Sequence, residues 1–167
     1  EGPRFEPVLE QYFNILYNNI DFNILLLFTF HSFTAIMHKI ITTLLLFLIL
    51  DTFYLQAVKS RFSSLIRKIQ KSDMTVDMYS AAACYLVMTF GFYYFIVKED
   101  KSVLDAALLG FVIYAVFDFT NMAIFKHWDF TTSMIDAIWG ACLFAMTRYF
   151  LVILEPYTKH IDSLYKY

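Results

Sequence analysis

Residues 44–58, LLLFLILDTFYLQAV, and residues 106–125, AALLGFVIYAVFDFTNMAIF, decide the fold. Each apolar run is interrupted by one acidic residue, Asp51 in the first and Asp118 in the second. With their apolar flanks, both runs reach the ~20 residues that a membrane-spanning helix requires. An Asp at the centre of such a helix costs about 2.5 to 3.5 kcal/mol on insertion, so it usually faces a partner, a water-filled cavity or a substrate path. Asp51 and Asp118 are therefore the first candidates for a functional site.

The composition of the whole chain also indicates a membrane protein. Of the 167 residues, 59% are hydrophobic and only 17% are charged, an apolar share above that of soluble domains. The formal net charge of −2 excludes a polybasic nucleic-acid binder, so no nucleic-acid partner is expected. Cys84 and Cys142 lie in different apolar runs, which favours packing roles over a disulfide.

The sequence predicts an all-α fold, an integral membrane four-helix bundle. Ser102 with Asp105, and Ser133 with Asp136, have the spacing of capping boxes and would start the third and fourth spans. Asp136 keeps two interpretations, as a helix cap or as a member of an acidic cluster. The four predicted spans lie near residues 40–58, 78–97, 105–125 and 134–154.

The segments outside the spans suggest three regions, 1–38, 39–154 and 155–167. Within the first region, residues 22–37 are apolar but too short to span, so they predict an interfacial or re-entrant helix, with an extra span as the alternative. The linker 59–77 has apolar residues at helical spacing opposite basic ones, which predicts an amphipathic surface helix. Pro156 is expected to end the fourth span and begin a polar tail.

The polar residues of the spans are predicted to meet at one level. The first and third spans cross in the same direction, and Asp51 and Asp118 each lie seven residues before the end of their span, roughly 10 Å below the same interface. The fourth span enters from that interface and brings in its own polar residues. The predicted cluster consists of Asp51, Tyr114, Asp118, Asn121, Asp136 and Trp139.

Two interpretations of this cluster stay open. Carboxylates that are close together in a low dielectric cannot both carry charge easily, so a shared proton or a bound cation would relieve the conflict, whereas Arg148 lies roughly 10 Å deeper. Alternatively, the polar groups only join the helices, through hydrogen bonds worth about 0.6 to 2 kcal/mol each. Close helix packing is predicted at two ridges of small residues, Ala137, Ala141 and Ala145 in the fourth span and Ala106 and Gly110 in the third.

Other residues are weaker candidates. His31 and His38 are seven apart on one helical face, but no Cys or carboxylate lies at ligand spacing nearby, so interfacial packing is favoured over a metal or haem site. His127 and Trp128 predict an anchor at the lipid head-group level. The common motifs of soluble enzymes are absent from the sequence. We therefore expect no metal, no cofactor and no catalytic residues, and we expect bound lipids.

Three pieces of the chain together resemble a family of small membrane proteins catalogued as domain of unknown function 2177. They are residues 44–55, 114–130 and 134–143, and the similarity covers roughly residues 39–150. The resemblance implies a four-helix fold and the same polar cluster, but no activity. One departure is Phe119, where the family has Leu. The residues that match the motifs of the family are Asp51, Tyr54 and Leu55, then Tyr114, Asp118, Thr120 and Asn121, then Asp136, Trp139 and Gly140.

The sequence favours a non-catalytic accessory or scaffold subunit of a larger membrane assembly. Its expected partners are membrane lipids and other membrane subunits, in an organellar inner membrane, for example the mitochondrial one, rather than a virion membrane. The alternative is a small transporter or ion-handling protein that uses Asp51, Asp118 and Asn121 as a cation or proton site. A third hypothesis, an intramembrane enzyme with Asp51 and Asp118 as acid and base, lacks the G-x-G-D element of membrane aspartyl proteases.

Overall fold

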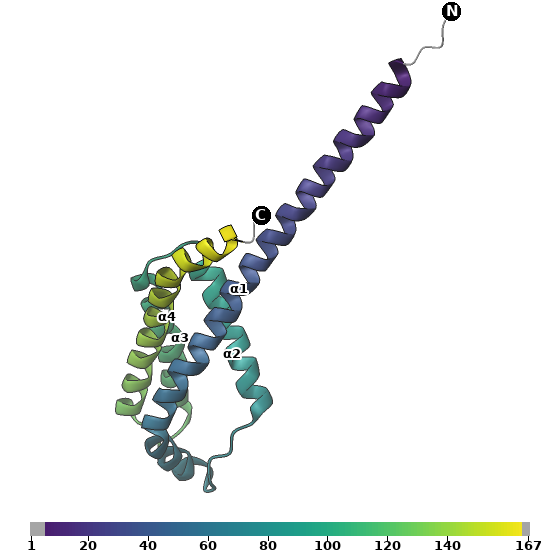
Figure 1. Ribbon diagram of the computed structural model, residues 1–167. Helices are drawn as coiled ribbons and strands as arrows, with labels where there is room; N and C mark the ends of the chain where they lie inside the picture. Colours follow the sequence, from purple (N-terminus) through teal and green to yellow (C-terminus); the bar gives the residue numbers. More distant parts are fainter. Residues whose placement is uncertain (1–5, 165–167) are drawn as a thin grey trace, which may run out of the picture. The chain divides into compact units, whose positions relative to one another are not determined.

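The structure, a computed structural model, describes the backbone of residues 6–164 and the side chains of residues 24–27 and 29–156. Among these residues all regular structure is helical, which confirms the predicted all-α fold (Figure 1). A short π-helical segment, η1, directly continues the second helix, and a turn then leads to the third. The elements are α1 (Glu6–Gln70), α2 (Met78–Phe92), η1 (Tyr93–Val97), α3 (Val103–Ile124) and α4 (Phe130–Leu164).

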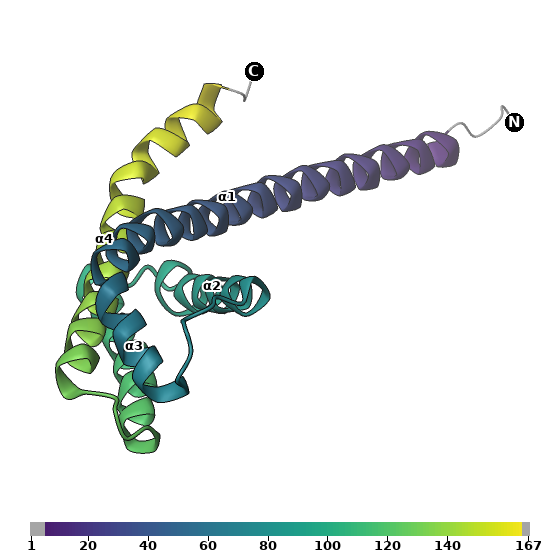
Figure 2. The same cartoon turned by 90° about the horizontal axis from the view of Figure 1, so that it is seen from below.

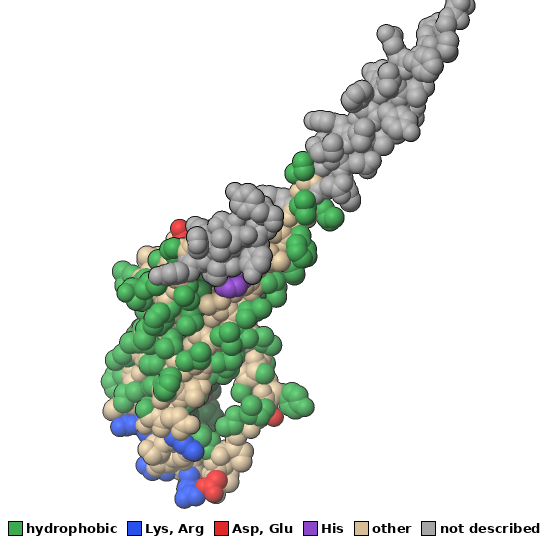
Figure 3. All heavy atoms as spheres, in the orientation of Figure 1, with side chains coloured by type: hydrophobic (Ala, Val, Ile, Leu, Met, Phe, Trp, Pro, Cys, Tyr) green, Lys and Arg blue, Asp and Glu red, His purple; other side chains and the backbone are tan. Residues whose placement is uncertain are grey.

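In the part of the chain that the structure describes, four helical segments are long and apolar enough to cross a membrane, as the sequence predicted. Helices suit this task because they satisfy their own backbone hydrogen bonds in lipid. Hydrophobic side chains cover the flanks of the bundle, and Lys and Arg side chains gather at the end of the bundle where α1 ends (Figure 3). The segments are Ile24–Gln70, Met78–Val97, Val103–Ile124 and Phe130–Pro156.

Helix α1 is longer than the sequence suggested. Residues 22–37 and the first part of the linker, residues 59–70, lie inside α1 and do not form separate helices. The reason is that no Gly or Pro occurs between Pro7 and Gln70, so nothing in this stretch interrupts the helix. The predicted amphipathic face is present within α1, because Leu65 is buried while Arg61 and Lys68 are exposed.

The start of α4 also differs from the expectation. Helix α4 begins at Phe130, because the Asp129 carboxylate accepts hydrogen bonds from the backbone N–H of Thr132 at 2.9 Å and from its hydroxyl at 2.7 Å. These bonds hold the pKa of the Asp129 carboxyl below its usual range. The predicted capping box of Ser133 and Asp136 is therefore wrong, whereas the capping box of Ser102 and Asp105 starts α3 as predicted.

Pro156 does not end α4, as the sequence had suggested, but lies inside it. A proline within a helix removes one backbone hydrogen bond and distorts the helix locally. Helices in membranes tolerate this because neighbouring groups and water can satisfy the released carbonyl.

The chain divides into two compact units, Glu1–His38 and Lys39–Tyr167, and each is described by itself. The second unit contains the C-terminal part of α1 together with α2, η1, α3 and α4. Its core joins three helices through Phe47 of α1, Phe92 of α2 and Phe144 of α4, all fully buried. The centroids of these three rings lie 5.0 to 5.4 Å apart. Aromatic packing at this spacing ties α1, α2 and α4 together.

The backbones of α3 and α4 approach each other most closely at Gly110 and Gly140. The two helices run side by side in both views (Figures 1 and 2). A Cβ atom at Gly110 would lie 2.2 Å from the carbonyl oxygen of Gly140, and one at Gly140 would lie 2.4 Å from the ring of Tyr114. Ala106 and Ala137, which the sequence placed on small-residue ridges, are fully buried. Only glycine fits at this crossing, so it fixes the distance between α3 and α4.

Replacing Gly140 with Ala should therefore destabilise the protein by about 1 to 3 kcal/mol, the usual cost of overpacking. The matched control is Gly91→Ala in α2, because a Cβ atom there would have no neighbour within 4 Å. The control should be neutral or stabilise the helix by up to about 1 kcal/mol. Unfolding in mixed detergent micelles measures both changes. Equal stability of the two variants would contradict the close crossing.

Candidate functional site

Helices α1 and α4 exchange hydrogen-bond donors between two acidic residues. The indole N–H of Trp139 on α4 donates to Asp51 on α1 at 2.8 Å, and the hydroxyl of Tyr54 on α1 donates to Asp136 on α4 at 2.7 Å. In both helices the acid and the aromatic donor are three residues apart, which places them on one helix face. The rings of Tyr54 and Trp139 are stacked, with centroids 4.4 Å apart and planes 6° from parallel. We call these two hydrogen bonds, with the four residues that form them, the reciprocal pair.

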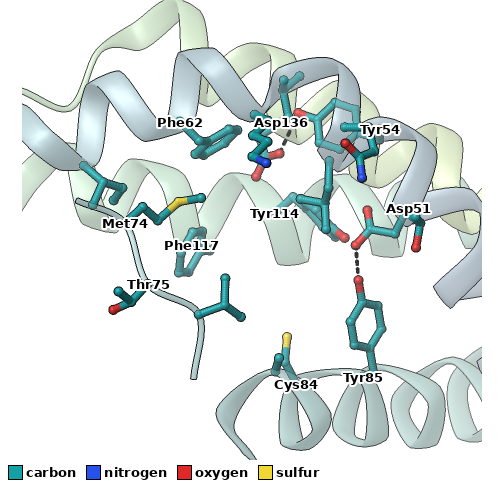
Figure 4. A pocket seen from close by; sticks show the side chains of 18 of the residues that line it. Asp51, Tyr54, Phe62, Met74, Thr75, Cys84, Tyr85, Tyr114, Phe117 and Asp136 are labelled. Carbon is teal, nitrogen blue, oxygen red and sulfur yellow. Dashed lines mark hydrogen bonds between the residues drawn. The ribbon is translucent and has the colours of Figure 1, made fainter. Parts of the chain in front are cut away.

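Helix α2 joins the reciprocal pair through Tyr85. Its hydroxyl donates to the second carboxylate oxygen of Asp51 at 2.5 Å (Figure 4). Both oxygens of Asp51 are therefore hydrogen-bonded, one to α4 and one to α2, and the side chain is 7% exposed. A buried carboxylate needs such donors, because an unpaired one would be costly in a low dielectric.

Asp118 on α3 is less well satisfied. It is fully buried, its Oδ1 accepts a hydrogen bond of 3.1 Å from the indole N–H of Trp128, and its Oδ2 has no donor. The carboxyl groups of Asp118 and Asp136 lie within hydrogen-bonding reach of each other. When both groups are ionised, neither can donate a hydrogen bond to the other. We call these two residues the acid pair.

The position of Trp128 corrects a prediction. The sequence suggested a ring at the lipid head-group level, but Trp128 is only 9% exposed and its N–H points to Asp118. A buried carboxylate without other donors explains this position, because a hydrogen bond to a charged acceptor is stronger than one to a neutral group. His127, the other half of the predicted anchor, is exposed.

The three acids receive donors but no compensating charge. Among residues 24–27 and 29–156, no Lys or Arg forms an ion pair with Asp51, Asp118 or Asp136. Arg148 donates instead to Asp100 at 2.5 Å and to the carbonyl of Lys101 at 2.7 Å. On α4 it lies twelve residues from Asp136, about 18 Å along the axis. Within the described part of the chain, the cluster is therefore a group of acids in an apolar bundle without a paired cation.

The other predicted members of the cluster take different positions. Tyr114 is half-buried, and its ring packs against the backbone at Gly140. Asn121 is half-buried on α3, and within the part of the chain whose side chains are described its amide makes no hydrogen bond to the acids. The structure thus brings Asp51, Asp118, Asp136 and Trp139 into one network, with Tyr114 beside it and Asn121 outside it.

Sequence reasoning missed two donors, Tyr85 and Trp128, and it noted Tyr54 only as part of a family motif. For Tyr85, the signal that the sequence offered was its depth in the predicted membrane span. Asp51 lies seven residues before the predicted end of its span, and Tyr85 lies seven residues after the start of the next span at Met78. On consecutive antiparallel helices these two positions have the same depth.

A cleft of about 710 Å³ lies against the cluster (Figure 4). Its walls come from the C-terminal half of α1, residues 74–76, α2 and α3, and most of the residues in them are apolar. Asp51 and Asp136 line the cleft, while Asp118 does not. The acid pair therefore has one member at the cleft and one buried behind it.

Residues 36–153 match the family described as predicted membrane protein (DUF2177). The chain belongs to the DUF2177 family. No curated protein and no solved structure gives a match. The match contains every member of the reciprocal pair and of the acid pair, so the whole site lies in the DUF2177 domain. The family match and the four candidate spans found in the described residues together identify the chain as an integral membrane protein.

The reciprocal pair predicts a specific cost for Tyr54→Phe. The change removes only the hydroxyl that donates to Asp136, and an unsatisfied buried acceptor costs about 1 to 3 kcal/mol. Tyr79→Phe is the control, because Tyr79 is 89% exposed. Unfolding in mixed micelles should separate the two variants. If Tyr54→Phe is as stable as the control, the hydrogen bond does not stabilise the fold.

Proposed function

We propose that this DUF2177 protein is a small ion-handling membrane protein whose acid pair, Asp118 and Asp136, takes up and releases a proton. One observation carries the proposal. Two carboxyl groups lie within hydrogen-bonding reach in the bundle, one buried oxygen of Asp118 has no donor, and no Lys or Arg among the described residues pairs with either acid. This is the ion-handling hypothesis of the sequence, with Asp136 in the place of Asn121.

A shared proton resolves both problems of the acid pair. Two unit charges about 4 Å apart repel each other by about 4 kcal/mol at an effective dielectric constant of 20. One proton removes this repulsion and supplies an O–H donor between the two carboxyl groups. A metal ion would need more ligands, and among the described residues no group of three His, Cys, Asp or Glu could hold one. The proposal therefore assigns a shared proton, and not a metal ion, to the acid pair.

The neighbouring residues give the two acids different tasks. Asp118 is fully buried and is held by Trp128, so it keeps its position. Asp136 lines the cleft and is 7% exposed, so a proton can enter and leave through it. Tyr54 fixes the Asp136 carboxylate by its hydrogen bond. The proposal requires no catalytic step and no cofactor.

The direct test is infrared spectroscopy of the protein in lipid nanodiscs over a range of pH. The wild type should show the carbonyl stretch of a protonated carboxylic acid at neutral pH, lost as the pH rises. In Asp118→Asn this signal should be absent, because the remaining acid no longer shares a proton with a second carboxyl group. Glu99→Gln is the control, since Glu99 lies outside the cluster and pairs with Lys98. A wild type without a protonated acid at neutral pH would overturn the proposal.

Proton flux into liposomes tests whether the site also moves the proton across the membrane. A potassium diffusion potential should drive uptake by wild type and Glu99→Gln, and Asp118→Asn should lose it. The isosteric amide preserves the shape of the side chain, so loss of flux with unchanged thermal stability assigns the effect to the proton.

The accessory role remains the second candidate, and the N-terminal unit favours it. Consecutive residues Ile24, Leu25, Leu26 and Leu27 are all exposed, so this turn of the helix is apolar on every side, and Phe30 and Phe33 are exposed beyond it. Residues 24–35 also lie outside the family match. A helix that is apolar all round requires lipid or partner helices around it. We infer from this surface that other membrane subunits pack against it.

Native mass spectrometry of the protein, extracted gently from its own membrane, tests the accessory role. A complex with defined subunits is the expected result, because those subunits would cover the apolar stretch. A free monomer or homodimer that carries only lipid would contradict the accessory role and leave the proton site as the remaining proposal.

A further inference from the structure

We propose that the cleft beside the acid pair binds a lipophilic organic cation. This inference rests on the proposed function and names the class of ligand that would exchange with the proton. Three properties of the cleft support it: its size and apolar walls, the sign of its charge and its aromatic lining.

The size and walls of the cleft suit an organic molecule. Its volume of about 710 Å³ falls within the range of about 300 to 1,000 Å³ typical of small-molecule sites. Leu55, Val58, Phe62 and Ile66 of α1 face it from one side, and Ala81 and Met88 of α2 from the other. A small hydrated ion would gain little from such walls, because hard cations prefer cages of oxygen ligands.

The charge of the cleft selects a cation. Asp51 and Asp136 line it, and among the described residues neither is paired with a Lys or Arg. The one basic residue in the lining, Lys59, lies eight residues from Asp51 on α1, about 12 Å along the axis. An anion would be repelled by the two acids, and a neutral lipid would leave them uncompensated.

Aromatic side chains strengthen the preference for an organic cation. A cation over the face of an aromatic ring is attracted by about 0.5 to 2 kcal/mol, and aromatic cages are a known way to hold quaternary ammonium groups. The aromatic residues that line this cleft come from α1, α2, α3 and the turn before α4: Tyr54, Phe62, Tyr85, Tyr114, Phe117 and Trp128.

Cation binding and proton binding are coupled through Asp136, which belongs to the acid pair and also lines the cleft. A bound cation replaces the positive charge of the shared proton, so one proton leaves as one cation binds. No covalent bond to carbon forms or breaks in this exchange. Raising the pH should therefore tighten cation binding.

The test uses tetraphenylphosphonium as the cation and tetraphenylborate, an anion of the same shape, as its control. The full chain is assayed in nanodiscs by intrinsic tryptophan fluorescence. The chain contains two tryptophans, and both belong to the site: Trp128 lines the cleft and Trp139 donates to Asp51. Tetraphenylphosphonium should change the emission with saturation, more tightly at higher pH, and tetraphenylborate should not. Equal binding of both ions would show an apolar groove without charge selection and would overturn the inference.

A variant and a labelling experiment keep the test independent of folding. Asp51→Asn should weaken tetraphenylphosphonium binding by at least about tenfold, since it removes one charge of a buried ion contact, and Glu99→Gln should not. In the unmutated chain, Cys84 lines the cleft while Cys142 does not, and both are exposed. Tetraphenylphosphonium should therefore slow the alkylation of Cys84 by N-ethylmaleimide and leave Cys142 unaffected. Equal rates at Cys84 with and without the cation would contradict binding in the cleft.

The two proposals can fail separately. If the acid pair is protonated but tetraphenylphosphonium does not bind, the proposed proton site stands and the proposed cation site is contradicted. Saturable, cation-selective binding that is independent of pH and of Asp118→Asn would keep the cleft as a cation site and remove its coupling to the proton.

Discussion

The fold of the DUF2177 domain depends on one constraint: a carboxylate inside an apolar helix must find hydrogen-bond donors on another helix. Asp51 and Asp136 meet this constraint by exchanging donors, since Trp139 donates to the first and Tyr54 to the second. Because acid and donor are three residues apart in each helix, both bonds form only in one rotation and one register of α1 against α4. The apolar surfaces of the helices alone would allow several rotations and registers, because hydrophobic contacts are not directional.

The same arrangement satisfies hydrogen bonds without balancing charge. The side chains that donate to the three acids, as far as the side chains are described, are all neutral: Tyr54, Tyr85, Trp128 and Trp139. Arg148 is the one cation buried in a span among the described residues, and Asp100 and the carbonyl of Lys101 occupy its guanidinium. A network built only for cohesion would be expected to neutralise its charges or to use amides and hydroxyls. The excess of negative charge is what the proton and the organic cation would compensate.

The sequence predicted the spans and the acids well, and the donors poorly, for a physical reason. Spans follow from apolar length, and an Asp within one is conspicuous because of its cost. Tyr and Trp carry no such cost, and in a chain with 20% aromatic residues nothing marks Tyr85 or Trp128 as a donor until the helices are packed. The prediction that α4 ends at Pro156 is wrong. A proline is a strong signal for the end of a helix in soluble proteins, and a weaker one in membranes, where neighbouring helices support the backbone.

The second unit is tightly packed on one side and open on the other, and the site needs both properties. At Gly110 and Gly140 the backbones of α3 and α4 approach each other closely, so Asp118 of α3 and Asp136 of α4 are held at a fixed separation, as the proposed shared proton would require. On the other side the cleft lies between residues 51–70 of α1 and residues 81–88 of α2, and the Tyr85 hydroxyl of α2 donates to Asp51 of α1. A cation that engages Asp51 would compete with this donor and would loosen α2 but not the crossing of α3 and α4. In the proposed exchange, access to the cleft and the proton affinity of the acid pair would therefore change independently, because α1 and α2 border the cleft whereas α3 and α4 hold the acid pair.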